Sequence, residues 1–300
     1  MLLLCVIYEG ENEDVMNGIE NIKYNFERKN VAIGISESIE NKTHFVKIFC
    51  SDDDYTEKVN HTFNIYMAEV LYDAVIKEFI HKSINSYLTE NYFFLKYDEI
   101  QKIRTLCYHA LKCNGAILDE NEVYFNNRKI SITRKIVDCI EENSDINIKG
   151  FLTFRMGEFK EDLCNSVDKV VENFMVEKEY EEFIKLLKYF VEIQQSKVEQ
   201  VNIYIERNGN YIIKDKLGND IMDDILSELS DTKYTGSVSM DDMIISGLIT
   251  LAPGNIIFHC VDNCVNKELI NTIKSVFLDR VEFCEECNTC KEIKGQYIKS

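Results

Sequence analysis

The stretch that decides the fold lies at residues 151–195 and reads FLTFRMGEFKEDLCNSVDKVVENFMVEKEYEEFIKLLKYFVEIQQ. Its apolar side chains recur at steps of three and four residues, which places them on one side of a helix, and no proline interrupts them. One helix of this length would be about 65 Å long at ~1.5 Å per residue, more than the width of a small domain. The sequence therefore predicts a long amphipathic helical stretch with a break near Glu177. The apolar positions are Leu152, Met156, Phe159, Leu163, Val167, Val170, Phe174, Tyr180, Phe183, Leu187 and Phe190.

This stretch is suited to packing and not to chemistry. A carboxylate-bridged metal pair in a helical bundle needs a Glu-x-x-His motif from two helices. The sequence has no histidine between His109 and His259, so that site is excluded here. The glutamates from Glu177 to Glu182 are interpreted as the solvated face of the helix. We expect the stretch to be a structural element.

Composition limits the class of protein. The chain has 300 residues, 45% of them hydrophobic, and a formal net charge of −18. A surface this acidic argues against nucleic-acid binding and against docking on anionic lipid, because both need basic patches. The apolar run at residues 1–8 is too short for a membrane span and lacks the basic leader of a signal peptide, so we expect a strand there. We expect a cytoplasmic protein whose eleven cysteines are mostly reduced.

The N-terminal part of the chain has the pattern of an α/β module at residues 1–60. Strands are predicted at 2–8, 31–35 and 45–49, with a helix at 15–26. Gly10 stands alone after the first strand, so a dinucleotide site or a P-loop is not supported. Residues 51–54 (SDDD) are similar to a capping box that opens a helix, and they lack the spacing of a calcium-binding loop.

Helices dominate the next part, which we predict as a helical domain at 61–197. The segments expected before the long stretch are 61–86, 97–113 and 128–142. After residue 198 the elements become short and indicate a C-terminal α/β module at 198–300. Strands are predicted at 201–206, 211–215, 256–259 and 280–283, and helices at 222–229, 240–252 and 267–277. Together these elements predict an α+β fold.

The strongest chemical signal is the run Cys284-x-x-Cys287-x-x-Cys290, which follows the last predicted strand. Thiolates at this spacing on a tight turn can converge on one metal ion, and a fourth ligand is then needed. His259 lies at the end of a strand that could pair with this one, and Cys260 and Cys264 follow it.

Zinc is the metal that this set of residues favours, since sites with three cysteines and one histidine are common for Zn²⁺. An iron–sulfur cluster is less supported, because the ferredoxin run continues to a fourth cysteine and a proline, whereas Lys291 follows here. The alternative is a set of reduced thiols near the C-terminus. The predicted metal ligands are Cys284, Cys287, Cys290 and His259.

Other candidate chemistry is weak. Cys107 and His109 are two residues apart on a predicted helix, so their side chains point to different faces and would not share a metal. The sequence contains no Gly-x-Ser-x-Gly elbow. No catalytic residue and no residue that binds an organic cofactor is assigned.

Four segments of the chain occur in an order and spacing that resembles the YtxC-like family of sporulation proteins from endospore-forming bacteria. The resemblance implies a cytosolic bacterial protein linked to sporulation, and it implies no catalytic residue or cofactor. The segments are NIKGFLTFRM at 147–156, FMVEKEYEEFIKLLKYFVEIQ at 174–194, DDMIISGLITLAPGNIIFH at 241–259 and RVEFCEEC at 280–287.

The leading functional hypothesis is a non-enzymatic accessory or regulatory protein of sporulation that acts through protein partners. An exposed apolar groove on its helices would be the partner site. The alternative is a metal-dependent enzyme or redox protein that uses the C-terminal cysteines with His259. A metal assay, and convergence of those side chains on one point, would separate the two hypotheses.

Overall fold

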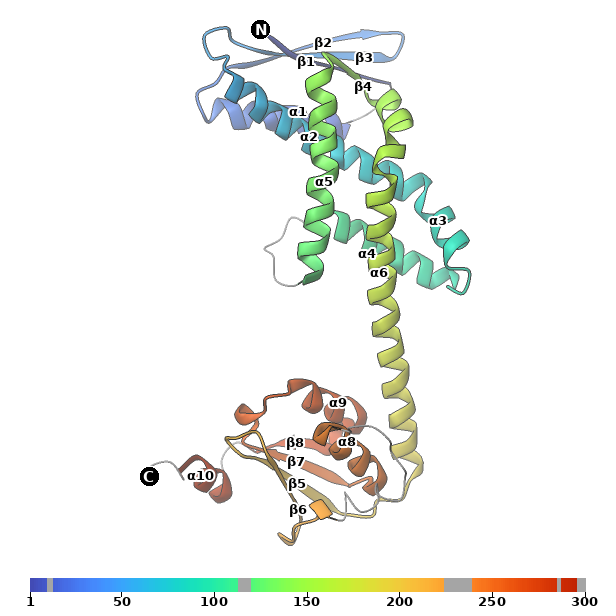
Figure 1. Cartoon of the computed structure of the whole chain (residues 1–300), viewed down its shortest axis with the longest axis vertical. Coiled ribbons are helices and arrows are strands. Elements are labelled where there is room, and N and C mark those ends of the chain that lie inside the picture. Colours follow the sequence, from blue (N-terminus) through green and yellow to red (C-terminus); the bar gives the residue numbers. More distant parts are fainter. Residues whose placement is uncertain (10–12, 113–119, 224–238, 285–286, 296–300) are drawn as a thin grey trace. The chain divides into compact units, whose positions relative to one another are not determined.

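The computed structural model describes residues 1–9, 13–112, 120–223, 239–284 and 287–295. The chain divides into two compact units, unit 1 (Met1–Met175) and unit 2 (Val176–Ser300), which we describe separately (Figure 1). The strands are β1 (Leu2–Glu9), β2 (Ile33–Glu40), β3 (Thr43–Cys50), β4 (Asp145–Asn147), β5 (Gln200–Ile205), β6 (Tyr211–Asp215), β7 (Asn255–His259) and β8 (Val281–Phe283). The helices are α1 (Glu13–Glu27), α2 (Glu57–Lys82), α3 (Ile84–Asn91), α4 (Tyr97–Leu111), α5 (Glu120–Glu142), α6 (Ile148–Ile193), α8 (Met240–Leu251), α9 (Lys267–Phe277) and α10 (Asn288–Gly295), with 3-10 turns at Val261–Asn263 and Leu278–Arg280.

Unit 1 contains a four-stranded sheet in the order β2-β3-β1-β4. β2 and β3 form an antiparallel hairpin, β1 pairs antiparallel with β3 on its other side, and β4 adds to β1 in parallel. The β2–β3 connection turns at Asn41 and Lys42, which both have positive φ, as a two-residue hairpin requires. The inward positions Leu4, Val6 and Tyr8 of β1 are buried, so the sheet covers a core on one face.

Helices pack on that face of the sheet, with α2 at the centre (Figure 1). Ten side chains of α2 are buried in pairs that recur every four residues, which gives the helix a continuous and mostly apolar side. α1 can lie close to α2 because Gly18 has no side chain: a Cβ there would be 2.7 Å from Cγ2 of Val70. The buried α2 positions are Phe63, Asn64, Met67, Ala68, Leu71, Tyr72, Val75, Ile76, Phe79 and Ile80.

The part of α6 that belongs to unit 1 is held to its neighbours by one buried and one half-buried carboxylate as well as by apolar contacts. Asp162 accepts hydrogen bonds from Arg128 at 2.9 Å, from Ser131 at 3.1 Å and from Lys135 at 2.8 Å, all on α5. One turn and a half further along, Asp168 accepts from the hydroxyl groups of two tyrosines of the α3 region at 2.7 Å each. These tyrosines are Tyr87 and Tyr92.

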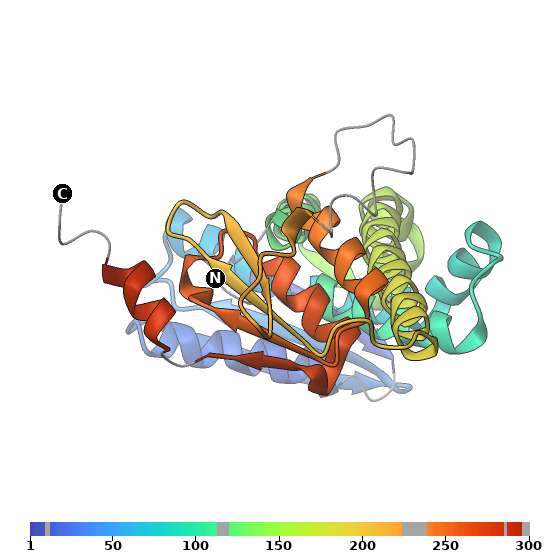
Figure 2. The same cartoon turned by 90° about the horizontal axis from the view of Figure 1, so that it is seen from below.

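Unit 2 contains a second four-stranded sheet, in the order β6-β5-β7-β8. β5 and β6 are an antiparallel hairpin, whereas β7 is parallel to β5 and β8 is parallel to β7. The two crossovers, through α8 and α9, step in the same direction along the sheet, so both helices lie on one face of it (Figure 2). The core between them contains Val201, Ile203, Ile205, Ile244, Leu248, Ile256, Phe258 and Ile273.

Local signals read from the sequence are confirmed at several element ends. Ser239 caps α8 by accepting a hydrogen bond from the backbone N–H of Asp242 at 3.1 Å, as its spacing predicts. The helix ends at Ala252, which has a left-handed conformation, directly before Pro253. α9 has the predicted bounds. The predicted helix at 222–229 falls largely outside the described residues.

Two expectations are wrong. α6 runs from Ile148 to Ile193 without a break near Glu177, because neither glycine nor proline occurs between residues 158 and 193 and every turn retains an apolar face. Residues 51–54 form a turn instead of opening a helix: the carboxylate of Asp54 accepts from the backbone N–H of Ala32 at 3.0 Å, and α2 begins only at Glu57, capped by Thr56.

The α+β class predicted from the sequence is confirmed by the helices and the two small sheets. The division into domains at 1–60, 61–197 and 198–300 stays a prediction. The compact units group the chain differently, because β4 pairs with β1 and one apolar core extends from Leu4 to Val171.

The buried carboxylate of Asp162 generates a prediction about stability. Burial alone would raise the pKa of Asp162, but the hydrogen bonds from Lys135 and Arg128 outweigh it and the pKa is lowered. The unfolded carboxyl titrates near ~3.9, so the contribution of the ionised group is fully present above that pH and is lost as pH falls through the lower folded pKa. We expect Asp162→Asn to reduce the free energy of unfolding of unit 1 by about 2 kcal/mol at neutral pH.

The control for this prediction is Glu161→Gln, an exposed acid one position earlier on the same helix. It should change the free energy of unfolding by less than ~0.5 kcal/mol. Denaturant unfolding at pH 7 and at successively lower pH measures both variants. An Asp162→Asn protein as stable as the Glu161→Gln protein would show that the contacts of Asp162 do not stabilise the unit.

Candidate metal centre

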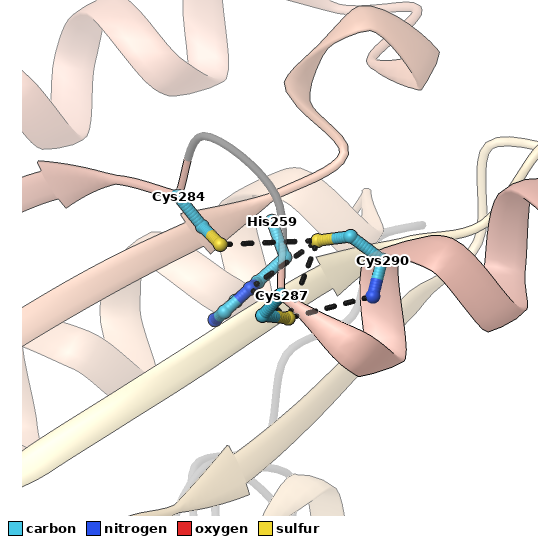
Figure 3. A group of neighbouring side chains, drawn as sticks. All are labelled: His259, Cys284, Cys287 and Cys290. Atoms are coloured by element: carbon cyan, nitrogen blue, oxygen red, sulfur yellow. Dashed lines mark hydrogen bonds between the residues drawn. The ribbon is translucent and has the colours of Figure 1, made fainter.

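Four side chains converge at one edge of the sheet of unit 2, and they are those that the sequence singled out. His259, Cys284, Cys287 and Cys290 each offer one donor atom, and these atoms all lie within 4.8 Å of one another (Figure 3). His259 is 5% exposed and Cys290 is 2% exposed, while the other two thiols are half-buried. The group is therefore a partly enclosed cluster and not a set of surface thiols.

The parallel pairing of β7 with β8 brings the first two donors together. Phe258 of β7 pairs with Phe283 of β8, so the next residues, His259 and Cys284, leave the two strands side by side. A backbone hydrogen bond from the N–H of Cys284 to the carbonyl oxygen of Phe258, at 2.9 Å, fixes this alignment. Parallel strands end at the same edge of a sheet, which explains why donors distant in sequence meet here.

The start of α10 supplies the other two donors. Cys287 precedes the first residue of the helix, and its sulfur accepts a hydrogen bond from the backbone N–H of Cys290 at 3.4 Å. The sulfur thus occupies the place of a side-chain N-cap. Two residues separate Cys287 from Cys290, so about one helical turn places both side chains on the same side of α10. Their sulfur atoms lie 3.5 Å apart.

Four of the six distances between the donors are close to the edges of a tetrahedron, and the two other pairs, both with Cys284, lie within 4.8 Å. Nδ1 of His259 lies 3.5 Å from the sulfur of Cys287 and 3.5 Å from that of Cys290, and the sulfur atoms of Cys284 and Cys290 lie 4.0 Å apart. With zinc bonds of about 2.3 Å to sulfur and ~2.0–2.1 Å to nitrogen, ideal edges are about 3.8 Å for two sulfur atoms and about 3.5 Å for sulfur and nitrogen. The separations among His259, Cys287 and Cys290 therefore suit one tetrahedral ion of the size of Zn²⁺, with Cys284 as the more distant fourth donor.

The imidazole of His259 is held in place from behind by β5. Its Nε2 lies 3.3 Å from Oδ1 of Asn202, which also accepts from Nε2 of Gln200 at 3.0 Å. The ring of Tyr204 stacks on the imidazole, with 4.2 Å between centroids and 18° between planes. If Nε2 carries the proton and donates to Asn202, Nδ1 has its lone pair free toward the three thiols, which is the tautomer a metal ligand needs.

The protonation of the cluster is shaped by burial and by contacts within the group. Burial lowers the pKa of His259, so the ring is neutral at pH 7. Burial, together with hydrogen bonds to Cys287 and Cys290, raises the pKa of the Cys284 thiol to about 11. Burial also acts to raise the pKa of the Cys287 thiol, but the hydrogen bonds from the backbone and side chain of Cys290 outweigh it and the pKa is lowered.

The other residues considered as ligands lie elsewhere. The thiol of Cys264 donates to the backbone carbonyl of Asn266 at 3.1 Å, and Cys260 is not part of the group of converging donors. Cys107 is buried in the core of unit 1 while His109, on the same helix, is exposed, so these two point to different faces as expected.

Sequence reasoning missed Asn202 and Tyr204, the residues of β5 that contact His259. A signal for Asn202 was available. The strand reads QVNIYI, and an amide placed among buried β-branched residues requires a polar partner. The partner could not be identified from the sequence, because it is supplied by a strand 57 residues away.

Unit 1 also has a cleft of about 670 Å³. It is lined by four lysines and four acids, and each lysine forms an ion pair with one of the acids. With its charges already matched within the chain, the cleft provides no distinct ligand chemistry. The pairs are Lys77–Asp14, Lys82–Glu78, Lys112–Asp73 and Lys149–Glu9.

Comparison with known proteins defines the class. The sequence profile of the YtxC-like family matches residues 65–282, which is more than half of the chain. The chain therefore belongs to the YtxC-like family. A curated relative from Bacillus subtilis (strain 168), described as uncharacterized protein YtxC, is 24% identical over 240 residues, which cover 75% of this chain and 79% of the relative.

No solved structure gives a significant match to the chain. Within the described residues, none of the helices is both long enough and apolar enough to cross a membrane.

Proposed function

We propose that this protein is a zinc-binding accessory protein in which Cys284, Cys287, Cys290 and His259 hold one Zn²⁺ ion. The observation that carries the proposal is the convergence of the four donor atoms within 4.8 Å of one another. Their separations support a single tetrahedral ion, and the neutral imidazole supports ligation through Nδ1.

The proposed role of the ion is structural. A catalytic zinc keeps a position open for water or substrate, whereas three thiolates and one imidazole fill all four positions. The ion would cross-link the ends of β7 and β8 to the start of α10. A helix of eight residues is marginal by itself in water, so this cross-link would hold α10 in place.

At the cellular level we propose a cytoplasmic protein that assists sporulation through protein partners. Membership of the YtxC-like family supports the link to sporulation. The closed donor set and the absence of an assigned catalytic residue favour an accessory role over catalysis. The competing proposal is a metal-dependent enzyme or redox protein. It requires a coordination position on the metal that exchanges its ligand, or a pair of thiols that cycles between dithiol and disulfide.

Metal content tests the zinc proposal. We expect one equivalent of Zn per chain in the purified protein, and a Co²⁺-substituted form with the absorption bands of a tetrahedral thiolate site. Cys287→Ser and Cys290→Ser should each reduce the bound metal to a small fraction of one equivalent, because each removes a thiolate ligand.

Cys264→Ser is the matched control, since this buried cysteine of the same unit lies outside the cluster. It should retain a full equivalent of Zn. A wild-type protein without stoichiometric metal, grown and purified with zinc present, would contradict the proposal. A Co²⁺ form that takes up a fifth ligand, or thiols that cycle between dithiol and disulfide, would favour the enzyme or redox alternative.

The contact between Asn202 and His259 generates a second prediction for the site. Asn202→Leu removes the acceptor that orients the imidazole, so we expect the affinity for Zn²⁺ to fall by about 10- to 100-fold. Asn202→Asp keeps an acceptor at this position and should restore the affinity to near that of the wild type. Competition with a chromophoric chelator measures both variants.

An equal loss of affinity in Asn202→Asp and Asn202→Leu would mean that the orientation of His259 does not depend on this acceptor. Circular dichroism of the zinc-loaded proteins shows whether either substitution disturbs the fold. Only a change in affinity without a change in fold supports the orienting role.

The cellular proposal is tested by deletion of the gene in its own host. We expect fewer heat-resistant spores, with restoration by the wild-type gene and not by the Cys287→Ser gene. Capture of a tagged protein from sporulating cells should return a specific partner. Normal sporulation in the deletion strain would contradict the cellular role and leave the zinc proposal to its own test.

A further inference from the structure

The part of α6 that belongs to unit 2 carries a row of exposed apolar side chains, which we call the α6 stripe. The members recur mostly at steps of three and four residues, and between 41% and 63% of each is exposed. They are Val176, Tyr180, Phe183, Leu186, Tyr189, Phe190 and Ile193.

Most of the stripe lies beside the face that α6 contributes to its own unit, and Tyr180, whose hydroxyl oxygen is 3.0 Å from that of Thr272 on α9, borders that face. That face consists of Ile184, Leu187 and Val191, which are buried in the core of unit 2. The segment at 176–193 thus has a buried apolar face and, next to it, an exposed one. Single exposed apolar residues are normal, but a contiguous row on one face is typical of an interaction site.

We infer that the α6 stripe is a homodimer interface, in which the stripes of two copies pack against each other in antiparallel orientation about a two-fold axis. A two-fold axis requires that residue i meets residue j wherever j meets i. We place the two-fold axis beside the bond between Ile184 and Lys185. Val176 of one copy then faces Ile193 of the second copy, Tyr180 faces Tyr189, and Phe183 faces Leu186. These three pairs match in size and chemistry, while the same reversal places Phe190 opposite Glu179.

The charges beside the stripe agree with the antiparallel arrangement. Glu182 and Lys185 are both exposed at its edge. In the antiparallel pair, Glu182 of one copy approaches Lys185 of the second copy, and symmetry repeats this contact. In a parallel pair Glu179, which lies within the stripe, would face Glu179 of the second copy, and like charges at that distance repel.

The available area is close to what a stable dimer uses. Large apolar side chains offer about 150–250 Å² each, so seven that are half exposed provide roughly 700 Å² per copy. A standard protein–protein interface buries about 800 Å² per partner. In a two-fold dimer the stripe of each copy covers the stripe of the other, so no other part of the chain has to contribute to the interface.

Sedimentation of the full-length, metal-loaded protein tests the inference. At micromolar concentration the wild type should sediment with twice the 35.1 kDa mass of the chain. Phe183→Glu, at the centre of the stripe, should weaken the dimer by at least ~30-fold, since a central apolar contact commonly contributes 2 kcal/mol or more. Phe154→Glu, another exposed phenylalanine of α6, is the control and should leave the dimer unchanged.

A charge exchange tests the orientation separately from the association. Glu182→Lys alone and Lys185→Glu alone each place like charges together twice per dimer, and each should weaken the dimer by about tenfold at low salt. The double variant restores opposite charges and should return to within about twofold of the wild type. Circular dichroism confirms that each variant is folded.

A wild type that remains monomeric, or a dimer that Phe183→Glu does not weaken, would overturn the inference. Failure of the double variant to recover would overturn the antiparallel arrangement. Zinc content, measured on the same samples, should stay at the wild-type value in every stripe variant. Loss of the zinc proposal and loss of the dimer are therefore separate outcomes.

Discussion

One helix, α6, packs into two different apolar cores along its length. The structure depends on both cores burying the apolar side chains that this helix presents to them. In unit 1 its residues Phe159, Leu163 and Val167 are fully buried in a core that also contains the first sheet. In unit 2 its residues Ile184 and Leu187 enter a different core. A helix that is apolar on several sides can be stable only if each side is covered.

Polar residues of α6 compensate for this wide apolar surface by fixing its contacts in register. Asp162 and Asp168 are the acids that turn inward, and each accepts hydrogen bonds from side chains of a neighbouring segment. A buried carboxylate is costly unless it is fully hydrogen-bonded, so only the register that supplies all its donors is favourable. Apolar packing alone would tolerate a shift of one turn along α6, whereas these contacts would not.

The positions of helices could be predicted well from the sequence. The length of α6 and the contacts between residues distant in the sequence could not. Steps of three and four residues located the helices, and α9 agrees to the residue, because its strong one-sided pattern leaves one solution. The break expected near Glu177 is absent because helical length is limited by the covering partners and not by the size of a typical domain. The turn at 51–54 was misread because Asp54 accepts from Ala32, a contact between distant residues that no local pattern contains.

In the candidate site, too, the features set by residue spacing could be predicted from the sequence, and those set by strand alignment could not. The spacing of the three cysteines was visible, and His259 was indicated by its position at a strand end. Which of His259, Cys260 and Cys264 would complete the set depended on the alignment of β7 with β8, and only the pairing of Phe258 with Phe283 places His259 beside Cys284. In the proposed zinc site, the fourth donor would come from inside the sheet, where His259 is 5% exposed and contacts Asn202, and it would fill the position that a catalytic zinc keeps open for substrate.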